Sequence, residues 1–473
     1  MGNAVVRRGF CRLGGAGGCR NSGGRMMSSI SKRVSPWLML PPSLDDTGNV
    51  EYKFHRLGSK IEEVYKKKDS GGGGFPLDGH GIQVAGSSHG WLALYNQVNH
   101  DVFLVNPITS RHIKLPPVKG VVSRFSLSCS PDDGDCRAMI SVGPTSRLVF
   151  CVPGRSTEWT PIGDLYCDRW NYRTQSSDTV MREYEDVVYS SRHKLFFCIT
   201  RFKTELEGWN VADPLSPTMD WRVPHNEELT FDRLDYPWPA ECQSESDLKD
   251  QCWHLKYLVL DEQSDELFLV VRHVNPRMRR DGSFAEDIYY SKFRGCDYSY
   301  PYKTVDFDVY KIDRHEGGKV KLRHMETSLN GLAMFVGINQ SCALSASEFP
   351  ELKPNSIYFT DEKRLMLLSK SPVHNRFGGH DNGIFDFQNN TFSSCCGRCP
   401  LVDSLDYGCI KRIDPPPLWF TPPPNTLKAS LKKLEVLKAS LSLRKLQDFL
   451  KSLKKLESLK ASLTELGALR ASL

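Results

Sequence analysis

Between residues 80 and 424, apolar residues occur in short runs that turn-forming residues separate. Each run holds about four to eight residues rich in Val, Phe, Tyr, Leu and Ile, and Gly, Pro, Asn or Asp lies at its ends. This pattern predicts β-strands, and the region shows no long segment with the 3.6-residue period of an amphipathic helix. The sequence therefore predicts an all-β fold for this part of the chain.

Neighbouring runs form pairs that predict β-hairpins. In residues 257–271, YLVLDEQSDELFLVV, two apolar runs flank a polar turn, and residues 383–392, GIFDFQNNTF, place Asn residues that tolerate positive φ between two others. A long meander of such hairpins must protect its sheet edges, and about 350 residues suit the radial repetition of a propeller. We expect a β-propeller of about six or seven four-stranded blades.

Residues 106–117, NPITSRHIKLPP, are interpreted as a turn between two strands. Pro107 follows the end of one apolar run, and Thr109 and Ser110 are expected to cap the turn. HIKLPP then begins an edge strand that ends at a double proline. The alternative is that Arg111 and His112 form a ligand-binding pair.

The two ends of the chain differ from this central region. Residues 1–36 are rich in Arg, Ser and Gly, and the first acidic residue is Asp45. This composition predicts a disordered targeting segment, and the dominance of Arg favours a mitochondrial transit peptide. A chloroplast peptide is the alternative, as is a basic arm on a protein of the cytoplasm or nucleus.

Residues 425–473 predict a long amphipathic α-helix. Leu recurs mostly at steps of three and four from 427 to 469, with Lys, Ser and Glu between. LKKLEVLKASL from Leu431 returns as LKKLESLKASL from Leu453, which indicates an internal duplication. The Leu stripe needs a cover, and we expect self-association through residues 427–469, docking on the rest of the chain, or contact with an anionic membrane.

Charge and cysteine content narrow the class of protein. The net charge of +6 comes from the ends, because the chain without residues 1–44 and 425–473 carries 44 bases against 52 acids. An acidic body argues against nucleic-acid binding. The 15 cysteines are mostly scattered, and some lie in apolar runs, as in LVFCVPG, which favours a reducing compartment. Cys396 and Cys399 have the spacing of half a zinc site, but no second pair follows at the required distance.

Few segments have the residues of a catalytic or cofactor site. His89 lies beside Ser87 and Ser88, but no Gly-x-Ser-x-Gly nucleophile elbow is present, so we expect a turn histidine. The glycines at 71–74 are not followed by the Lys-Ser or Lys-Thr of a phosphate-binding loop and are interpreted as a linker. We expect no catalytic residue, no metal and no cofactor.

Two charged segments are interpreted as solvent-exposed. Residues 182–189, REYEDVVY, could supply paired carboxylates, but exposed charges at a strand edge explain them better. Residues 273–282, HVNPRMRRDG, form a basic loop that could touch an acidic partner. The residues that bind a partner cannot be named from the sequence.

Distinctive segments occur along residues 37–424 in a fixed order. They include SPWLMLPP, SSHGWLAL, VFLVNPITSRHIKLPP, DVVYSSRHKLFF, TVDFDVYKID, GINQSCALSASEFPELKPNSIYFTDE, GIFDFQNNTF and LWFTPPP. Together they resemble the plant family called domain of unknown function 295. The resemblance implies a KIB-type β-propeller over 37–424, a region that an F-box precedes in many members.

The N-terminal region departs from the F-box members. Residues 1–36 lack a Leu-Pro-x-x-Leu opening and a helical run, so the chain resembles the F-box-lacking, organelle-targeted branch of the family. We expect a non-enzymatic protein-interaction scaffold, because a propeller presents loops around a central channel and needs no catalytic residues of its own. An F-box-type substrate adaptor of a ubiquitin ligase, or an enzyme with a site at the mouth of a central channel, are the alternatives.

Overall fold

The computed structural model describes the central part of the chain. The described residues are 34–44, 46, 50–58, 62–67, 82–143, 146–171, 176–201, 205–223, 249, 252–275, 301–314, 320–362, 377–395 and 412–423. Most of the predicted targeting segment, the glycines at 71–74, Cys396, Cys399 and the predicted C-terminal helix lie outside these ranges.

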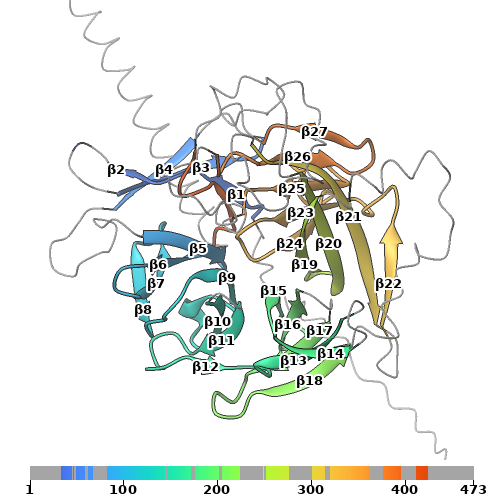
Figure 1. Cartoon of the computed structure of the whole chain (residues 1–473). Helices are drawn as coiled ribbons and strands as arrows, with labels where there is room; N and C mark the ends of the chain where they lie inside the picture. Colours follow the sequence, from blue (N-terminus) through green and yellow to red (C-terminus); the bar gives the residue numbers. More distant parts are fainter. Residues whose placement is uncertain are drawn as a thin grey trace, which may run out of the picture. The chain divides into compact units, whose positions relative to one another are not determined.

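The described elements are β-strands and one short 3-10 helix, η2 (Pro131–Asp133), which confirms the all-β prediction (Figure 1). Most strands form antiparallel meanders that we name blades. Blade B contains β5 (Ile82–Ser88), β6 (Trp91–Asn96), β7 (Val102–Asn106) and β8 (Arg111–Leu115). Blade C contains β9 (Val122–Leu127), β10 (Ala138–Val142), β11 (Arg147–Cys151) and β12 (Thr160–Pro161). Blade D contains β15 (Tyr184–Ser190), β16 (Leu195–Thr200), β17 (Leu206–Asn210) and β18 (Thr218–Val223).

The remaining strands form three further blades and one separate hairpin. Blade E contains β19 (Trp253–Asp261), β20 (Glu266–Asn275), β21 (Lys303–Arg314) and β22 (Val320–Met325). Blade F contains β23 (Leu332–Val336), β24 (Cys342–Ser345), β25 (Ser356–Phe359), β26 (Gly383–Asp386) and β27 (Thr391–Ser393). Blades E and F form one nine-stranded sheet, because β19 and β24 pair in parallel at Leu260 and Cys342. Blade A contains β1 (Trp37–Met39), β2 (Ser43–Leu44), β3 (Val50–Arg56), β4 (Glu62–Lys67) and β28 (Leu418–Phe420). The hairpin between blades C and D pairs β13 (Tyr166–Asn171) with β14 (Ser176–Met181).

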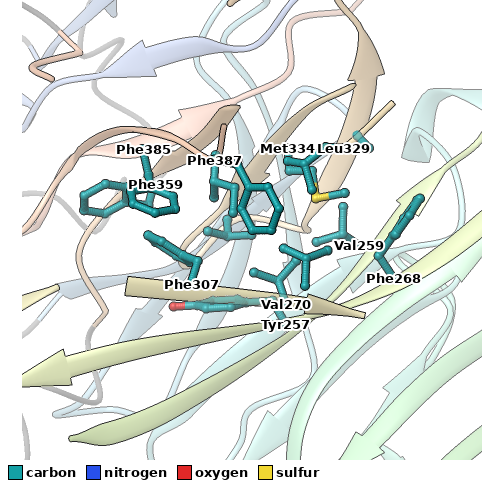
Figure 2. Packing of buried hydrophobic residues seen from close by; sticks show 14 of the residues in the cluster. Tyr257, Val259, Phe268, Val270, Phe307, Leu329, Met334, Phe359, Phe385 and Phe387 are labelled. Carbon is teal, nitrogen blue, oxygen red and sulfur yellow. The ribbon is translucent and has the colours of Figure 1, made fainter. Parts of the chain in front are cut away.

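Six apolar clusters join the blades into a closed ring. Each cluster lies between two consecutive blades, from A and B around to F and A. Figure 2 shows the cluster between blades E and F, where the ring of Phe307 packs at a tilt against those of Phe359 and Phe385, with centroid distances of 5.4 and 5.2 Å. The ring closes in blade A, because β28 from the C-terminal part pairs with β1. The described strands thus form a β-propeller of six blades, which confirms the prediction of six or seven.

The hairpins predicted from sequence are present. β19 pairs with β20 around Glu262–Asp265, and β26 pairs with β27 around a turn in which Asn390 has φ 50°. β8 lies at the edge of blade B, as predicted. The prediction that Thr109 and Ser110 cap the turn was wrong. The side chain of Asn106 caps it, because its Oδ1 accepts hydrogen bonds from the backbone N–H groups of Ile108 and Thr109, both at 3.0 Å.

The two ends of the strands carry different connections. Tight turns such as β5–β6, β15–β16 and β19–β20 lie at one end, which we call the hairpin face. The long connections β4–β5, β18–β19, β20–β21, β25–β26 and β27–β28 all leave from the opposite end, which we call the long-loop face. Antiparallel pairing dictates this separation, since alternate connections of a meander lie at opposite ends.

Candidate functional site

Buried charges gather near the long-loop face, where the inner strands β9 and β15 begin and where β20 and β25 end. Arg124 on β9 lies between two carboxylates: its Nη1 donates to Glu362 Oε2 at 2.7 Å, and its Nε lies 3.4 Å from Asp186 Oδ1. All three side chains are 5% exposed or less. The group connects blade C to β15 of blade D and to the connection after β25 of blade F.

One guanidinium serves two carboxylates in this group, so it cannot fully offset both negative charges. Burial raises the pKa of Asp186 to about 7, although Arg124 and the backbone N–H of Leu258, which donates to Asp186 Oδ2 at 2.8 Å, act in the opposite direction. Asp186 is therefore a group whose charge depends on pH near neutrality.

Arg272 on β20 is the second buried cation of this region, and its side chain is fully buried. Its Nε donates to Thr304 Oγ1 at 2.7 Å, and its Nη1 donates to the carbonyl of Thr360 at 2.7 Å. Its Nη2 lies 2.9 Å from Asp381 Oδ2. The carboxylate of Asp381 also accepts the backbone N–H and the hydroxyl of Thr304, at 3.0 and 2.7 Å.

Tyr302, Asp361 and His380 extend this group. The Tyr302 hydroxyl donates to Asp361 Oδ2 at 2.7 Å, and burial raises the pKa of Asp361. His380 Nε2 donates to the Tyr302 carbonyl at 2.9 Å, while its Nδ1 accepts the N–H of Gly378 at 3.1 Å. These contacts tie the end of the β20–β21 connection to both described ends of the β25–β26 connection.

The charged groups therefore fix the bases of long connections to the sheets. Arg124 holds residues 360–362 to blades C and D, and Arg272 holds 301–304, 360–362 and 377–382 to blade E. A buried ion pair is a poor source of net stability but strongly specifies one arrangement of its partners. We call this set, Arg124, Asp186, Glu362, Arg272, Asp381, Asp361, Tyr302 and His380, the anchor cluster.

The interpretation of residues 182–189 as exposed charges was wrong. Arg182, Glu185 and Asp186 are 3–4% exposed, because β15 is the inner strand of blade D and is covered on both sides. Arg182 Nη2 lies 2.7 Å from Glu207 Oε1 and also pairs with Glu205. The segment provides one carboxylate of the anchor cluster and an ionic core for blade D.

His89 lies in a tight turn, as predicted, with φ 50° followed by Gly90 with φ 80°. Ser88 Oγ contacts His89 Nδ1 at 2.8 Å, but the same hydroxyl donates to Gln340 and accepts the N–H of Leu127 at 3.2 Å. Ser88 is 4% exposed. These contacts join blades B, C and F, and the buried hydroxyl is not placed as a nucleophile.

Arg111 and His112 do not form a pair. Successive residues of a strand point to opposite sides, so the two side chains of β8 diverge. Arg111 instead forms an exposed ion pair with Asp132 and lies 5.9 Å from the ring centroid of Trp91. The structure assigns Arg111 to the contact between blade B and the β9–β10 loop.

The described ranges contain neither a group of side chains arranged to bind a metal ion nor a helix that could span a membrane. There, no group of three or more His, Cys, Asp and Glu side chains is arranged to hold a metal ion. The described residues also contain no helix with the length and apolarity needed to span a bilayer. The basic loop of 273–282 is described only as far as Asn275, the end of β20.

The chain is similar to several known proteins over parts of its length. An F-box protein of Arabidopsis thaliana is 23% identical over 148 residues, a match that covers 29% of this chain and only 37% of that protein. The Cps50 (Swd1) β-propeller domain of Myceliophteria thermophila is similar with a TM-score of 0.32 and 9% identity, covering 77% of this chain and 88% of that one. The periplasmic gluconolactonase PpgL of Pseudomonas aeruginosa gives a TM-score of 0.27 with 13% identity, over 61% and 82% of the two chains.

The family is given by a sequence match that spans most of the propeller. The family described as KIB1-4 beta-propeller matches residues 62–386, from β4 of blade A to β26 of blade F. This range includes the whole anchor cluster and the bases of the two long connections that it holds. The chain belongs to the KIB1-4 beta-propeller family.

Proposed function

We propose that the chain is a non-enzymatic protein-interaction scaffold that binds a protein partner on the long-loop face. The observation that supports this proposal is the anchor cluster, because buried ion pairs hold the bases of two long connections in one arrangement. Binding residues concentrate on loops that a rigid scaffold positions. The connections at the hairpin face, in contrast, are no longer than about ten residues, and several of its turns bond to neighbouring blades.

Catalysis is not the function that this geometry favours. In the anchor cluster, each cation contacts a carboxylate and each group is buried, so the charges stabilise one another. The Ser88–His89 contact joins blades. A substrate adaptor is the second candidate, favoured by the Arabidopsis relative that is named an F-box protein.

The proposal predicts that charge reversal in the connection after β20 weakens partner capture. β20 ends at the long-loop face with Asn275, and Arg277, Arg279 and Arg280 follow it in the sequence. A triple change of these arginines to Glu is expected to reduce proximity labelling of specific neighbours at least about tenfold. The matched control changes Arg155, Arg192 and Lys194 to Glu. These three residues are exposed and lie at the hairpin face. The control variant should label the same neighbouring proteins as the wild-type chain.

Two outcomes of this experiment contradict the proposal. If the control variant loses its labelled neighbours and the variant in the connection after β20 keeps them, the partner binds on the hairpin face. An identical set of neighbours for all three proteins would show that neither charge group contributes to recognition. Recovery of a ubiquitin-ligase scaffold subunit that depends on the long-loop residues would favour the adaptor function.

We also propose that the protein acts in mitochondria. The support is the composition of residues 1–36, which carry seven Lys or Arg residues and no acid. Residues 1–44 fused to a fluorescent protein are expected to direct it to mitochondria, and a variant with all seven bases changed to Gln should stay in the cytosol. A diffuse signal from the unchanged segment would refute the mitochondrial address, and a plastid signal would favour the chloroplast alternative.

A further inference from the structure

Cys129 and Cys136 face each other across the base of the β9–β10 loop. β9 and β10 pair with Leu127 opposite Ala138, and the backbone N–H of Ser128 donates to the Arg137 carbonyl at 2.9 Å. Continuing this register by one residue places the two cysteines opposite each other at a position without backbone hydrogen bonds. At such positions, Cα atoms are about 4.5 Å apart, which lies in the range that a disulfide spans.

The contacts of the two thiols agree with this register. Cys136 Sγ lies 3.1 Å from the carbonyl oxygen of Cys129, and the Cys136 thiol also donates to the Cys129 sulfur. Ser128 Oγ lies 3.8 Å from the same sulfur. These donors lower the pKa of Cys129 to about 7. In contrast, the hydrogen bond to Cys129, together with burial, raises the pKa of Cys136. Cys129 is half-buried and Cys136 is buried, so the more reactive sulfur is also the more accessible one.

The loop that joins the two cysteines is acidic. It contains Asp132, Asp133 and Asp135, all of which are exposed. Negative charge beside the sulfur disfavours approach of an anionic oxidant such as oxidised glutathione. A small neutral peroxide meets no such barrier.

We propose that Cys129 and Cys136 form a reversible disulfide on reaction with hydrogen peroxide. The Cys129 thiolate attacks one peroxide oxygen, the O–O bond breaks, and hydroxide leaves to become water, which gives a sulfenic acid on Cys129. The Cys136 sulfur then attacks the Cys129 sulfur, the S–O bond breaks, and a second water leaves with the Cys136 proton. In total, the two thiols lose two electrons to one molecule of peroxide. A thiol reductant reduces the disulfide back to two thiols.

The bond would strengthen contacts that hold three blades together. Within the loop, Ser130 Oγ accepts the Trp91 N–H of blade B at 3.3 Å, and Asp132 pairs with Arg111 of the same blade. Next to it, the guanidinium of Arg137 donates to the carbonyls of Val211 and Ala212, after β17 of blade D. A cross-link at the base of the loop limits its opening. Oxidation would therefore stabilise the contacts of this loop of blade C with blades B and D.

The sequence allows a direct test, because both cysteines lie in one tryptic peptide, residues 125–137. The full chain is treated with hydrogen peroxide, blocked with N-ethylmaleimide and digested. We expect a peptide that is two hydrogens lighter and carries no maleimide, and dithiothreitol before blocking should restore two maleimides. Oxidation should be at least about tenfold faster in the folded chain than in urea, because the fold places the sulfurs together.

Variants separate this site from general thiol oxidation. Cys136→Ser should accumulate a sulfenic acid on Cys129 that dimedone traps, and Cys129→Ser should leave Cys136 unoxidised. Cys151 and Cys198, which are buried in blades C and D, serve as controls and should stay reduced. Equal rates in the folded and unfolded chain, a bond from Cys129 to another cysteine, or faster reaction with oxidised glutathione than with peroxide would overturn the proposal.

Discussion

Replacing Arg272 with Met is expected to lower the free energy of unfolding by about 3–5 kcal/mol. The side chain is fully buried, and its guanidinium contacts Thr304, the Thr360 carbonyl and Asp381. Methionine fills part of the volume but provides no charge, so the carboxylate of Asp381 would remain buried without its cation. Urea unfolding followed by fluorescence, with the slope checked for two-state behaviour, measures the loss.

Two further variants determine whether the unpaired charge is the cause. Arg272→Met combined with Asp381→Asn removes both charges and should recover part of the loss, which gives a favourable coupling energy. Arg111→Met removes a cation whose side chain is 57% exposed in its ion pair with Asp132, and it should cost less than about 1 kcal/mol. A loss at Arg272 no larger than the loss at Arg111 would show that the anchor cluster does not hold the loop bases.

Local patterns were sufficient to predict the architecture. Apolar runs bounded by Gly, Pro, Asn and Asp predicted strands, and the turns in residues 257–271 and 383–392 predicted hairpins that the structure contains. These features depend on neighbours in sequence, so the sequence carries them directly. Pairing of β28 with β1 joins residues far apart in the chain, and the local pattern does not predict it.

The anchor cluster could not be predicted, because its members are brought together by the ring. Glu362 and Arg124 are separated by 238 positions, and Asp381 and Arg272 by 109. The sequence nevertheless indicated a buried cation, because Arg272 lies inside the apolar run LFLVVRHV. A cation in a strand that is buried on both sides requires a partner, so the residue type predicts an ion pair without identifying the acid.

Residues 182–189 show why exposure was harder to infer than strand content. The charged residues of the segment were interpreted as exposed charges at a strand edge. The inner strand of a blade instead has both faces covered, so its polar residues must be paired inside the protein. Asp186 meets Arg124, and Arg182 meets Glu207. The position of a strand within its blade, which local pattern does not give, therefore decides the environment of its charges.

Stability is expected to fall as the pH rises from about 4 to 7, by about 1.4 kcal/mol per pH unit from Asp186 alone. Burial raises the pKa of Asp186 to about 7 in the folded chain, compared with an ordinary value of 3.8. Between these two values the folded chain keeps a proton that the unfolded chain releases. Raising the pH therefore favours the unfolded state in this window, and the contribution is constant above pH 7.

Asp186→Asn isolates this contribution from all other titrating groups. The amide is similar in shape to the protonated acid and cannot ionise, so wild type and variant should have similar stability near pH 4. The difference between their unfolding free energies should then grow in favour of the variant up to pH 7. Asp132→Asn, at an exposed ion pair, is the matched control and should show little dependence on pH. A difference between wild type and Asp186→Asn that is the same at pH 5 and pH 8 would mean that Arg124 keeps Asp186 ionised.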